Sequence, residues 1–269
     1  QGKKQNITLG EQTLQPGRNQ MDFTVKLEDA VLWSPDYPHL YQATLLADDQ
    51  VAATDRFGFR EFKTDAHRML LNGKPILPVG IVMNFRTFYN LPGIWENQYN
   101  IMRRVLAAHK EWGVNMIFPQ GAHLFYPRLF YDICDELGIM IQEWQAAVSA
   151  SVLLKTCALF DDEDTIKRVR YIYNHPSFVM FTIGNECRDA IFIEPINHVY
   201  DLFKRIDGQA RPVCAVSGGW PDKYVFKEDV IDVHAYFGVI SGHALDTGRR
   251  FEDANQMVWN AHERALPIG

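Results

Sequence analysis

The stretch Phe178-Val179-Met180-Phe181-Thr182-Ile183-Gly184-Asn185-Glu186 is typical of a buried β-strand that ends in a carboxylate. Its unbroken apolar run indicates a strand covered on both faces, as in parallel sheets. The strand is predicted over Phe178–Gly184, and the other segments of similar character are Ile76–Met83, Val114–Pro119, Ile139–Glu143, Val213–Ser217 and Ile231–Tyr236. The sequence therefore predicts six buried strands after residue 75.

Amphipathic helices are predicted between these strands. Apolar or aromatic residues recur at helical spacing in two stretches, at Met102, Val105, Leu106 and His109 and at Val199, Leu202, Phe203 and Ile206. Strands that alternate with helices indicate a parallel sheet with crossover connections, either a doubly wound sheet or a (β/α)8 barrel. No G-x-G-x-x-G follows Ile81, whereas polar and aromatic residues follow many strand ends, as a barrel active site requires. We therefore predict an α/β fold, a (β/α)8 barrel of which about six βα units are present.

The first sixty residues have a different period. Alternating runs at 21–27 and 40–46 are separated by turn-forming clusters at 15–19 and 47–50. This pattern predicts part of a small antiparallel β sandwich over residues 1–62, with further strands before Gln1, and the partial barrel over residues 63–269.

Composition excludes several classes of protein. The chain has 269 residues, a formal net charge of −6 and 47% hydrophobic residues, which excludes a disordered chain and a basic nucleic-acid-binding stripe. No apolar run reaches the roughly 18 residues of a membrane helix, so we expect no membrane partner. Because the net charge is negative, we also expect no nucleic acid as a partner. The four cysteines form no C-x-x-C pair and are expected to be buried free thiols, which leaves the compartment open.

Glu186 is the strongest candidate for catalysis. The end of a barrel strand is partly desolvated, and desolvation favours the protonated carboxyl group that a general acid needs. The neighbouring amide of Asn185 could hold a substrate hydroxyl. A structural alternative is that Glu186 caps the next helix or pairs with Arg188.

The sequence also resembles glycoside hydrolase family 2, the β-galactosidase, β-mannosidase and β-glucuronidase group. The matching segments are 32–35, 38–41, 56–60, 71–75, 112–116, 130–139, 174–177, 183–186 and 211–213. The resemblance implies an immunoglobulin-like domain followed by a (β/α)8 barrel. It implies a retaining, β-galactosidase-like exo-β-glycosidase that acts on a terminal sugar, with Glu186 as acid/base.

A retaining glycosidase also needs a nucleophilic carboxylate. In the family this residue is a Glu at the end of the seventh barrel strand, and residues 265–269 look like the start of that strand. We therefore expect the nucleophile after Gly269, the 269-residue piece alone to be inactive, and its open barrel edges to be covered by the rest of the protein or another chain. The remaining glutamates of loop or helix context, expected to be solvated, are Glu194, Glu228, Glu252 and Glu263.

Further residues are candidates for binding the carbohydrate substrate. They are His123, Glu143, Trp144, Trp220, His234 and Tyr236. Strand alternation places His234 and Tyr236 on one face, which the family turns toward the sugar. Glu143 is expected to hold either the substrate or the surrounding network, and the two tryptophans either stack on a sugar or pack at the barrel rim. His123 is either a substrate ligand or a structural histidine.

Phe118 departs from the family pattern, which commonly has an arginine there. An arginine can orient catalytic carboxylates through charge-assisted hydrogen bonds, and phenylalanine cannot. This difference favours the alternative hypothesis of a non-catalytic carbohydrate-binding or assembly scaffold. We expect no cofactor, because no phosphate-binding loop is present, and no metal ligand set transfers from the family.

Overall fold

The computed structural model describes residues 4–13, 15–17, 19–65, 68–84, 93, 97–120, 126–144, 162–187, 189–218 and 225–232. The chain divides into two compact units, Gln1–Val31 and Leu32–Gly269. Among the described residues, no helix combines the length and apolar character needed to cross a membrane.

The first unit differs from the sequence prediction. Its described residues form no strand, although the alternating run at 21–27 predicts one. A β-strand is stable only when its main-chain groups pair with a neighbouring strand, and an alternating pattern does not supply that partner. The prediction of a strand at 21–27 is therefore wrong for this structure, and the domain boundary at 62/63 stays a prediction.

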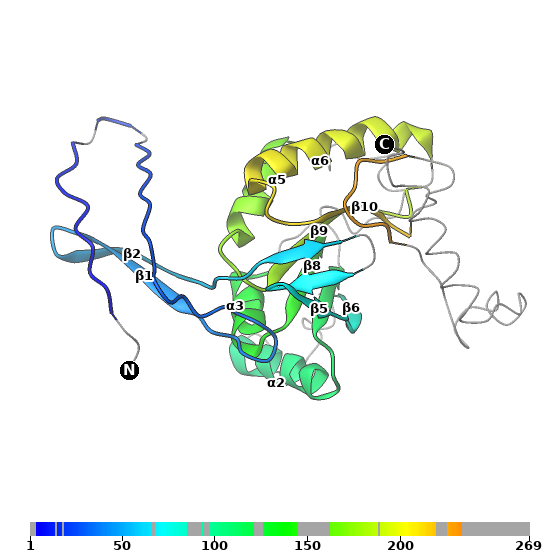
Figure 1. Cartoon of the computed structure of the whole chain (residues 1–269), viewed down its shortest axis with the longest axis horizontal. Helices are drawn as coiled ribbons and strands as arrows, with labels where there is room; N and C mark the ends of the chain where they lie inside the picture. Colours follow the sequence, from blue (N-terminus) through cyan, green and yellow to red (C-terminus); the bar gives the residue numbers. More distant parts are fainter. Residues whose placement is uncertain are drawn as a thin grey trace, which may run out of the picture. The chain divides into compact units, whose positions relative to one another are not determined.

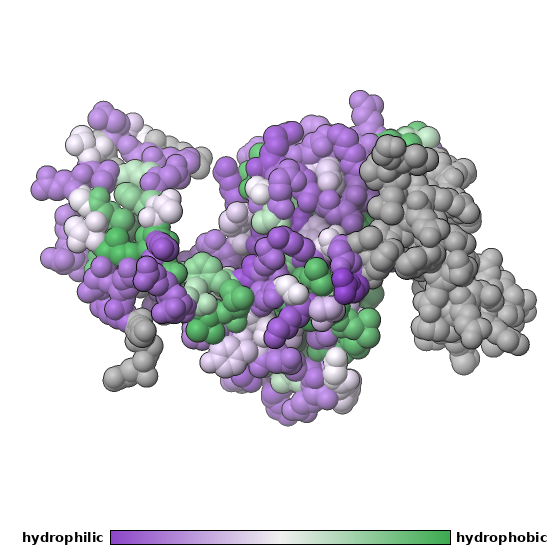
Figure 2. All heavy atoms as spheres, in the orientation of Figure 1, coloured by the Kyte–Doolittle hydropathy of each residue, from purple (hydrophilic) through white to green (hydrophobic). Residues whose placement is uncertain are grey.

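The second unit opens with an antiparallel hairpin. Strands β1 (Tyr41–Ala47) and β2 (Gln50–Phe57) pair across a turn at Asp48 and Asp49, whose φ angles are 50° and 62°. Aspartate tolerates the left-handed conformation that tight hairpin turns require. The exposed apolar side chains of the hairpin include Leu45, Leu46 and Val51, whereas Figure 2 shows a largely hydrophilic visible face elsewhere on the described residues.

A small antiparallel sheet follows the hairpin. Its strands are β3 (Phe62–Thr64), β4 (Met69–Leu71) and β5 (Lys74–Ile76). Strands β4 and β5 are joined by Asn72 and Gly73, with φ angles of 52° and 76°. An Asn-Gly pair at these angles is the preferred sequence of a two-residue hairpin.

The rest of the described chain alternates strands and helices (Figure 1). The strands are β6 (Gly80–Asn84), β7 (Met116–Gln120), β8 (Met140–Trp144), β9 (Phe178–Asn185) and β10 (Val213–Ser217). The helices are α2 (Gln98–Glu111), α3 (Arg128–Leu137), α5 (Asp162–Ile172) and α6 (Ile193–Asp207), the last preceded by the 3-10 turn η2 (Ala190–Phe192). All strand pairs are parallel, in the order β10-β9-β8-β7-β6. This is the predicted α/β fold, a partial (β/α)8 barrel.

Two apolar clusters hold the strands in place. The larger cluster joins one face of the sheet to the helices, with Ile117, Ile141 and Phe181 facing residues such as Leu106 and Phe203. The smaller cluster lies on the other face and joins Met116, Met140 and Val179 to Trp33, Phe62 and Leu71. Both faces of β8, β9 and β10 are covered, so these strands are apolar almost throughout, whereas β6 leaves Val82 58% exposed. Three cysteines, Cys134, Cys187 and Cys214, are buried free thiols, as predicted.

Candidate active site

The parallel register brings the carboxyl ends of neighbouring strands together at one edge of the sheet. Asn84 of β6 pairs in register with Gln120 of β7, and Asn185 of β9 pairs with Ser217 of β10. In parallel sheets of barrel enzymes, the active site is built at this edge. Asn185 and Glu186 therefore lie where the sequence places a catalytic site.

Glu186 is held by its main chain in an unusual conformation. Its φ angle is 51°, in the left-handed region, and its N–H donates to the carbonyl oxygen of Ser217 at 2.8 Å. The side chain is half-buried. A left-handed conformation is uncommon for a residue other than glycine, and such conformations cluster at functional sites. The local strain thus marks the residue that the sequence analysis selects for catalysis.

Gly184 permits the chain to turn back after β9. A Cβ atom at this position would lie 2.8 Å from Sγ of Cys187. The thiol of Cys187 also contacts the carbonyl oxygen of Asn185 at 3.7 Å. Glycine is therefore required by the close approach of the chain segment that carries Asn185 and Glu186.

Asn185 presents an unsatisfied acceptor. Within the described residues, its side-chain Oδ1 is buried and has no hydrogen-bond partner. Buried polar atoms in native proteins almost always have a hydrogen-bond partner, so an atom without one indicates a place for a ligand or an ordered water. A sugar hydroxyl could donate to this oxygen, which is the role that the sequence analysis gives Asn185.

Trp144 at the end of β8 has the complementary property. Its ring is buried, and its Nε1 has no hydrogen-bond acceptor in the part of the chain that the structure describes. An indole N–H is a donor only, so it could hold a substrate oxygen. Its stacking role stays a prediction, because stacking on a sugar needs an accessible ring face.

Glu143 lies on the helix side of β8. Its Oε2 accepts a hydrogen bond of 2.8 Å from the hydroxyl of Tyr131 in α3, whereas the preceding residue, Gln142, donates to Thr182 of β9 at 2.7 Å. Burial raises the pKa of Glu143 to about 7, and the charge of Arg168 in α5 and the Tyr131 hydrogen bond oppose that rise. These contacts favour a role in the network over direct contact with substrate.

Two carboxylates, Glu228 and Asp232, lie beside β10. Glu228 is half-buried, and its Oε2 accepts a hydrogen bond of 3.2 Å from the N–H of Ala215. Burial raises its pKa to about 7. The expectation that Glu228 is a solvated surface carboxylate is therefore wrong, because segment 228–230 lies along the edge of β10. Asp232 accepts a hydrogen bond of 2.6 Å from Ser217 Oγ, so both acids adjoin the strand that anchors Glu186.

Four predicted site residues lie outside the described residues. They are His123, Trp220, His234 and Tyr236. The predicted strand Ile231–Tyr236 is described only at its start, where the preceding residue, Val230, bridges Cys214 in parallel. The roles of these four residues stay predictions.

One group of described side chains has spacing that would suit a metal ion. Asp132, Asp135 and His175 offer ligand atoms within 4.8 Å of one another. Each of the three side chains already has a partner in the protein: Asp135 Oδ2 lies 2.6 Å from His175 Nδ1, and Arg56 pairs with Asp132 at 3.0 Å. Asp135 also accepts from the N–H of Ser177 at 2.9 Å. The cluster therefore ties α3 to the start of β9.

Comparison with known proteins gives two family matches. Residues 62–258 match the model described as the TIM barrel domain of glycosyl hydrolases family 2, and residues 1–60 match a second model of glycosyl hydrolases family 2.

Solved structures of similar fold include proteins from Eisenbergiella tayi, Bacteroides vulgatus and Parabacteroides merdae. The β-galacturonidase of Eisenbergiella tayi bound to galacturonate is 29% identical, with a TM-score of 0.58, over 70% of this chain and 33% of that one. A β-glycosidase of Bacteroides vulgatus is 26% identical, with a TM-score of 0.54, over 71% of this chain and 25% of that one. The β-glucuronidase of Parabacteroides merdae, 22% identical with a TM-score of 0.65, matches in fold over 88% of this chain and 29% of its own. The present chain thus spans about a third or less of these structures.

Proposed function

Because this chain belongs to glycosyl hydrolases family 2, we propose that the protein is a retaining exo-β-glycosidase that hydrolyses terminal β-linked sugars. The observation that carries the proposal is the position of Glu186, in a left-handed conformation at the carboxyl end of a barrel strand that is buried at every residue but its last. Carboxylates at this end of a barrel are placed to act on a ligand.

The proposed mechanism gives Glu186 two successive roles. As a general acid it donates its proton to the glycosidic oxygen while a second carboxylate attacks the anomeric carbon and forms a glycosyl-enzyme. As a general base it then takes a proton from the water that hydrolyses this intermediate. The family resemblance assigns the second carboxylate to the seventh barrel strand.

The orphaned polar groups support a carbohydrate ligand. Oδ1 of Asn185 is a buried acceptor, and Nε1 of Trp144 is a buried donor, both at carboxyl ends of strands that lie side by side in the sheet. A sugar hydroxyl is both a donor and an acceptor, so hydroxyls of one ring could satisfy both atoms. In our proposal Asn185 orients the sugar, and Glu143 with Tyr131 stabilises the strand ends behind it.

For the sugar itself, we propose the galactose configuration, with the neutral β-galactoside as substrate. The sequence resemblance favours a β-galactosidase-like enzyme, and the 29% identical structure is a β-galacturonidase. Galactose and galacturonic acid share the axial hydroxyl at C4, so a site that recognises this hydroxyl suits both. The galacturonide is the alternative substrate.

The experiment is a panel of 4-nitrophenyl β-glycosides assayed with the full-length protein. We expect the galactoside to be cleaved with the highest kcat/KM, and NMR of the first product to show the β-anomer. Preference for the galacturonide or glucuronide would overturn the sugar assignment alone. Initial release of the α-anomer would overturn the retaining mechanism.

A second function is favoured by one observation. Phe118 packs against the smaller apolar cluster, which contains Met116 and Met140, and a Cβ atom at Gly80 would lie 2.6 Å from its ring. The position that commonly holds an arginine in the family is thus part of an apolar contact. A non-catalytic carbohydrate-binding scaffold would show saturable binding of galactosides and no turnover of any compound in the panel.

A further inference from the structure

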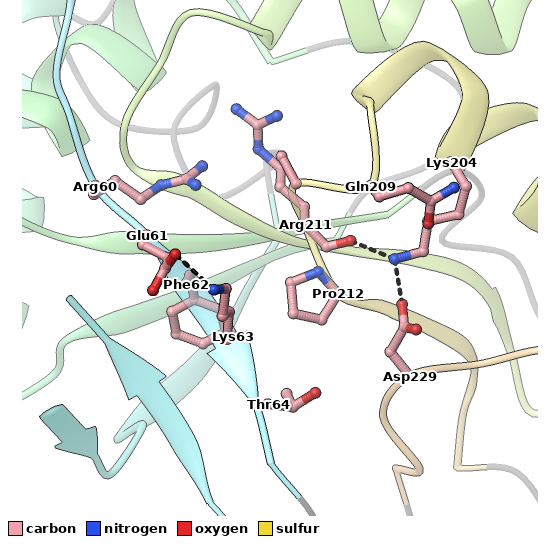
Figure 3. A pocket seen from close by; sticks show the side chains of 11 residues that line it. Arg60, Glu61, Phe62, Lys63, Thr64, Lys204, Gln209, Arg211, Pro212 and Asp229 are labelled. Atoms are coloured by element: carbon pink, nitrogen blue, oxygen red, sulfur yellow. Dashed lines mark hydrogen bonds and ion pairs between the residues drawn. The ribbon is translucent and has the colours of Figure 1, made fainter. Parts of the chain in front are cut away.

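A cavity of about 410 Å³ lies beside the residues that lead into β10, at the end of that strand opposite Ser217, and Figure 3 shows the side chains that line it. It is bounded by β3, by the carboxyl end of α6 and by the segment that leads into β10. Its charged wall residues are Arg60, Glu61, Lys63, Lys204, Arg211 and Asp229. Cationic side chains therefore outnumber acidic ones around the cavity.

Three of the four cations have a carboxylate partner. Lys63 pairs with Glu61 at 2.7 Å, and Lys204 pairs with Asp229 at 2.6 Å. Arg211 pairs with the buried Asp207 behind the cavity wall. In each pair the two charges neutralise each other. The fourth cation of the cavity wall has no such ion pair among the described residues.

Arg60 is that fourth cation. Its Nε donates to the carbonyl oxygen of Pro176 at 3.0 Å, and its Nη2 donates to the carbonyl oxygen of Phe178. Within the described residues, no carboxylate lies within hydrogen-bonding distance of its guanidinium group, and Nη1 has no partner. Carbonyl dipoles solvate a cation but do not neutralise its charge, so Arg60 has the capacity to bind an anion.

The neighbouring arginine increases this capacity. Nε of Arg211 donates to the same carbonyl oxygen of Phe178, at 2.8 Å, so two guanidinium groups converge on one acceptor. Burial lowers the pKa of Arg60 to about 9, the charge of Arg211 lowers it further, and the charges of Asp207 and Asp135 oppose this lowering, so the group remains cationic at neutral pH. Like charges this close repel each other, and a bound anion would relieve that repulsion.

We propose that this cavity binds an oxyanion of the phosphate or sulfate class, held by the guanidinium group of Arg60 with the ammonium group of Lys63 at the rim. The planar fork of a guanidinium group matches the oxygen spacing of such anions, and charge-assisted hydrogen bonds to them are strong. The site is separate from the proposed glycosidase site and does not depend on it.

The test is titration of the full-length protein with inorganic phosphate, followed by calorimetry and by ³¹P NMR line broadening in a buffer without other oxyanions. We expect saturable binding. Arg60→Gln should weaken it by about tenfold or more, and Lys63→Gln, at a side chain that is 63% exposed, should weaken it about threefold. The matched control is Arg68→Gln, because Arg68 pairs with Asp65 at 2.8 Å outside the cavity and should leave binding unchanged.

Three results would overturn the proposal. They are the absence of saturable phosphate binding, unchanged affinity in folded Arg60→Gln, and an equal loss in Arg68→Gln, which would indicate non-specific charge attraction. Arg60 also braces two carbonyl groups, so its variant needs a check of folding by circular dichroism. If Arg60→Gln does not fold, Lys63→Gln decides, and unchanged phosphate affinity in that variant counts against the site.

Discussion

The main-chain N–H of Glu186 donates a hydrogen bond of 2.8 Å to the carbonyl oxygen of Ser217, and this bond ties the end of β9 to the end of β10. The bond holds Glu186 at a φ angle of 51°. The candidate acid/base is therefore positioned by the sheet itself, since main-chain pairing, and not a flexible loop, determines where its Cα lies. A site held in this way is pre-organised for its ligand.

We first predict the effect of replacing Glu186 with glutamine. General acid–base catalysis contributes about 10²- to 10⁴-fold, so kcat/KM for an unactivated galactoside should fall by that order. An aryl glycoside with an activated leaving group needs no protonation and should lose much less in the first step, measured as the burst of released phenol. Glu194→Gln, at an exposed position of α6, is the control and should keep full activity. Equal losses on both substrates would contradict the assignment.

A second prediction concerns the turn after β9. Gly184→Ala places a methyl group 2.8 Å from Cys187 Sγ, and overpacking of this kind costs about 1–3 kcal/mol of unfolding free energy. The double variant Gly184→Ala/Cys187→Ala should recover part of the loss, because the thiol is the atom that clashes. Urea unfolding of the wild type, both single variants and the double variant gives the coupling. Additive losses would show that the close approach to Cys187 is not the cause.

The third prediction is a pH dependence from Glu143. Its pKa is about 7 in the folded protein and about 4.5 when unfolded, so the folded state binds more protons between these values. Its contribution to stability is complete below about pH 4.5 and is lost as the pH rises through about 7. Glu143→Gln does not titrate, so its unfolding free energy relative to wild type should increase by about 1–3 kcal/mol between about pH 4 and pH 8.

Urea unfolding at several pH values measures this difference for Glu143→Gln. Glu194→Gln provides the comparison at an exposed carboxylate, where the difference from wild type should stay nearly constant. A flat difference for Glu143→Gln over the same pH range would show that Glu143 titrates alike in the folded and unfolded states.

The fourth prediction tests the ion pair behind the basic cavity. Asp207 is 1% exposed and accepts from the N–H of Arg211 at 2.6 Å as well as pairing with its guanidinium group. Asp207→Asn leaves the buried Arg211 without its carboxylate partner and should cost about 3–5 kcal/mol of unfolding free energy.

Asp201→Asn, on the same helix, is the matched control for Asp207→Asn. Asp201 is 44% exposed and pairs with Lys227 at 2.7 Å, and a surface pair of this kind contributes about 1 kcal/mol or less. Thermal and urea unfolding should separate the two variants clearly. Similar stabilities for both would show that the buried pair is not needed to compensate the arginines.

Much of the barrel was predictable from local pattern. The predicted strand Val213–Ser217 has the same bounds as β10, and Phe178–Gly184 differs from β9 by one residue. The helical spacings at 102–109 and 199–206 fall within α2 and α6. Each of these elements buries one face or both, so the spacing of apolar residues along the sequence is sufficient to predict it. The run at 21–27 has the same kind of alternation without a strand, because pairing needs a partner that the run itself does not contain.

The sequence by itself determined the alternation of buried strands and helices, and with it the place of Glu186 at the carboxyl end of a strand. Only the tertiary structure decided that Glu143 faces Tyr131 and the helices, and that Glu228 lies against β10. It also decided that Arg60 and Arg211, 151 positions apart, share one carbonyl oxygen. Local periodicity follows from chain geometry, whereas the surroundings of a charge depend on which distant segments pack beside it, and those contacts form only when the sheet is assembled.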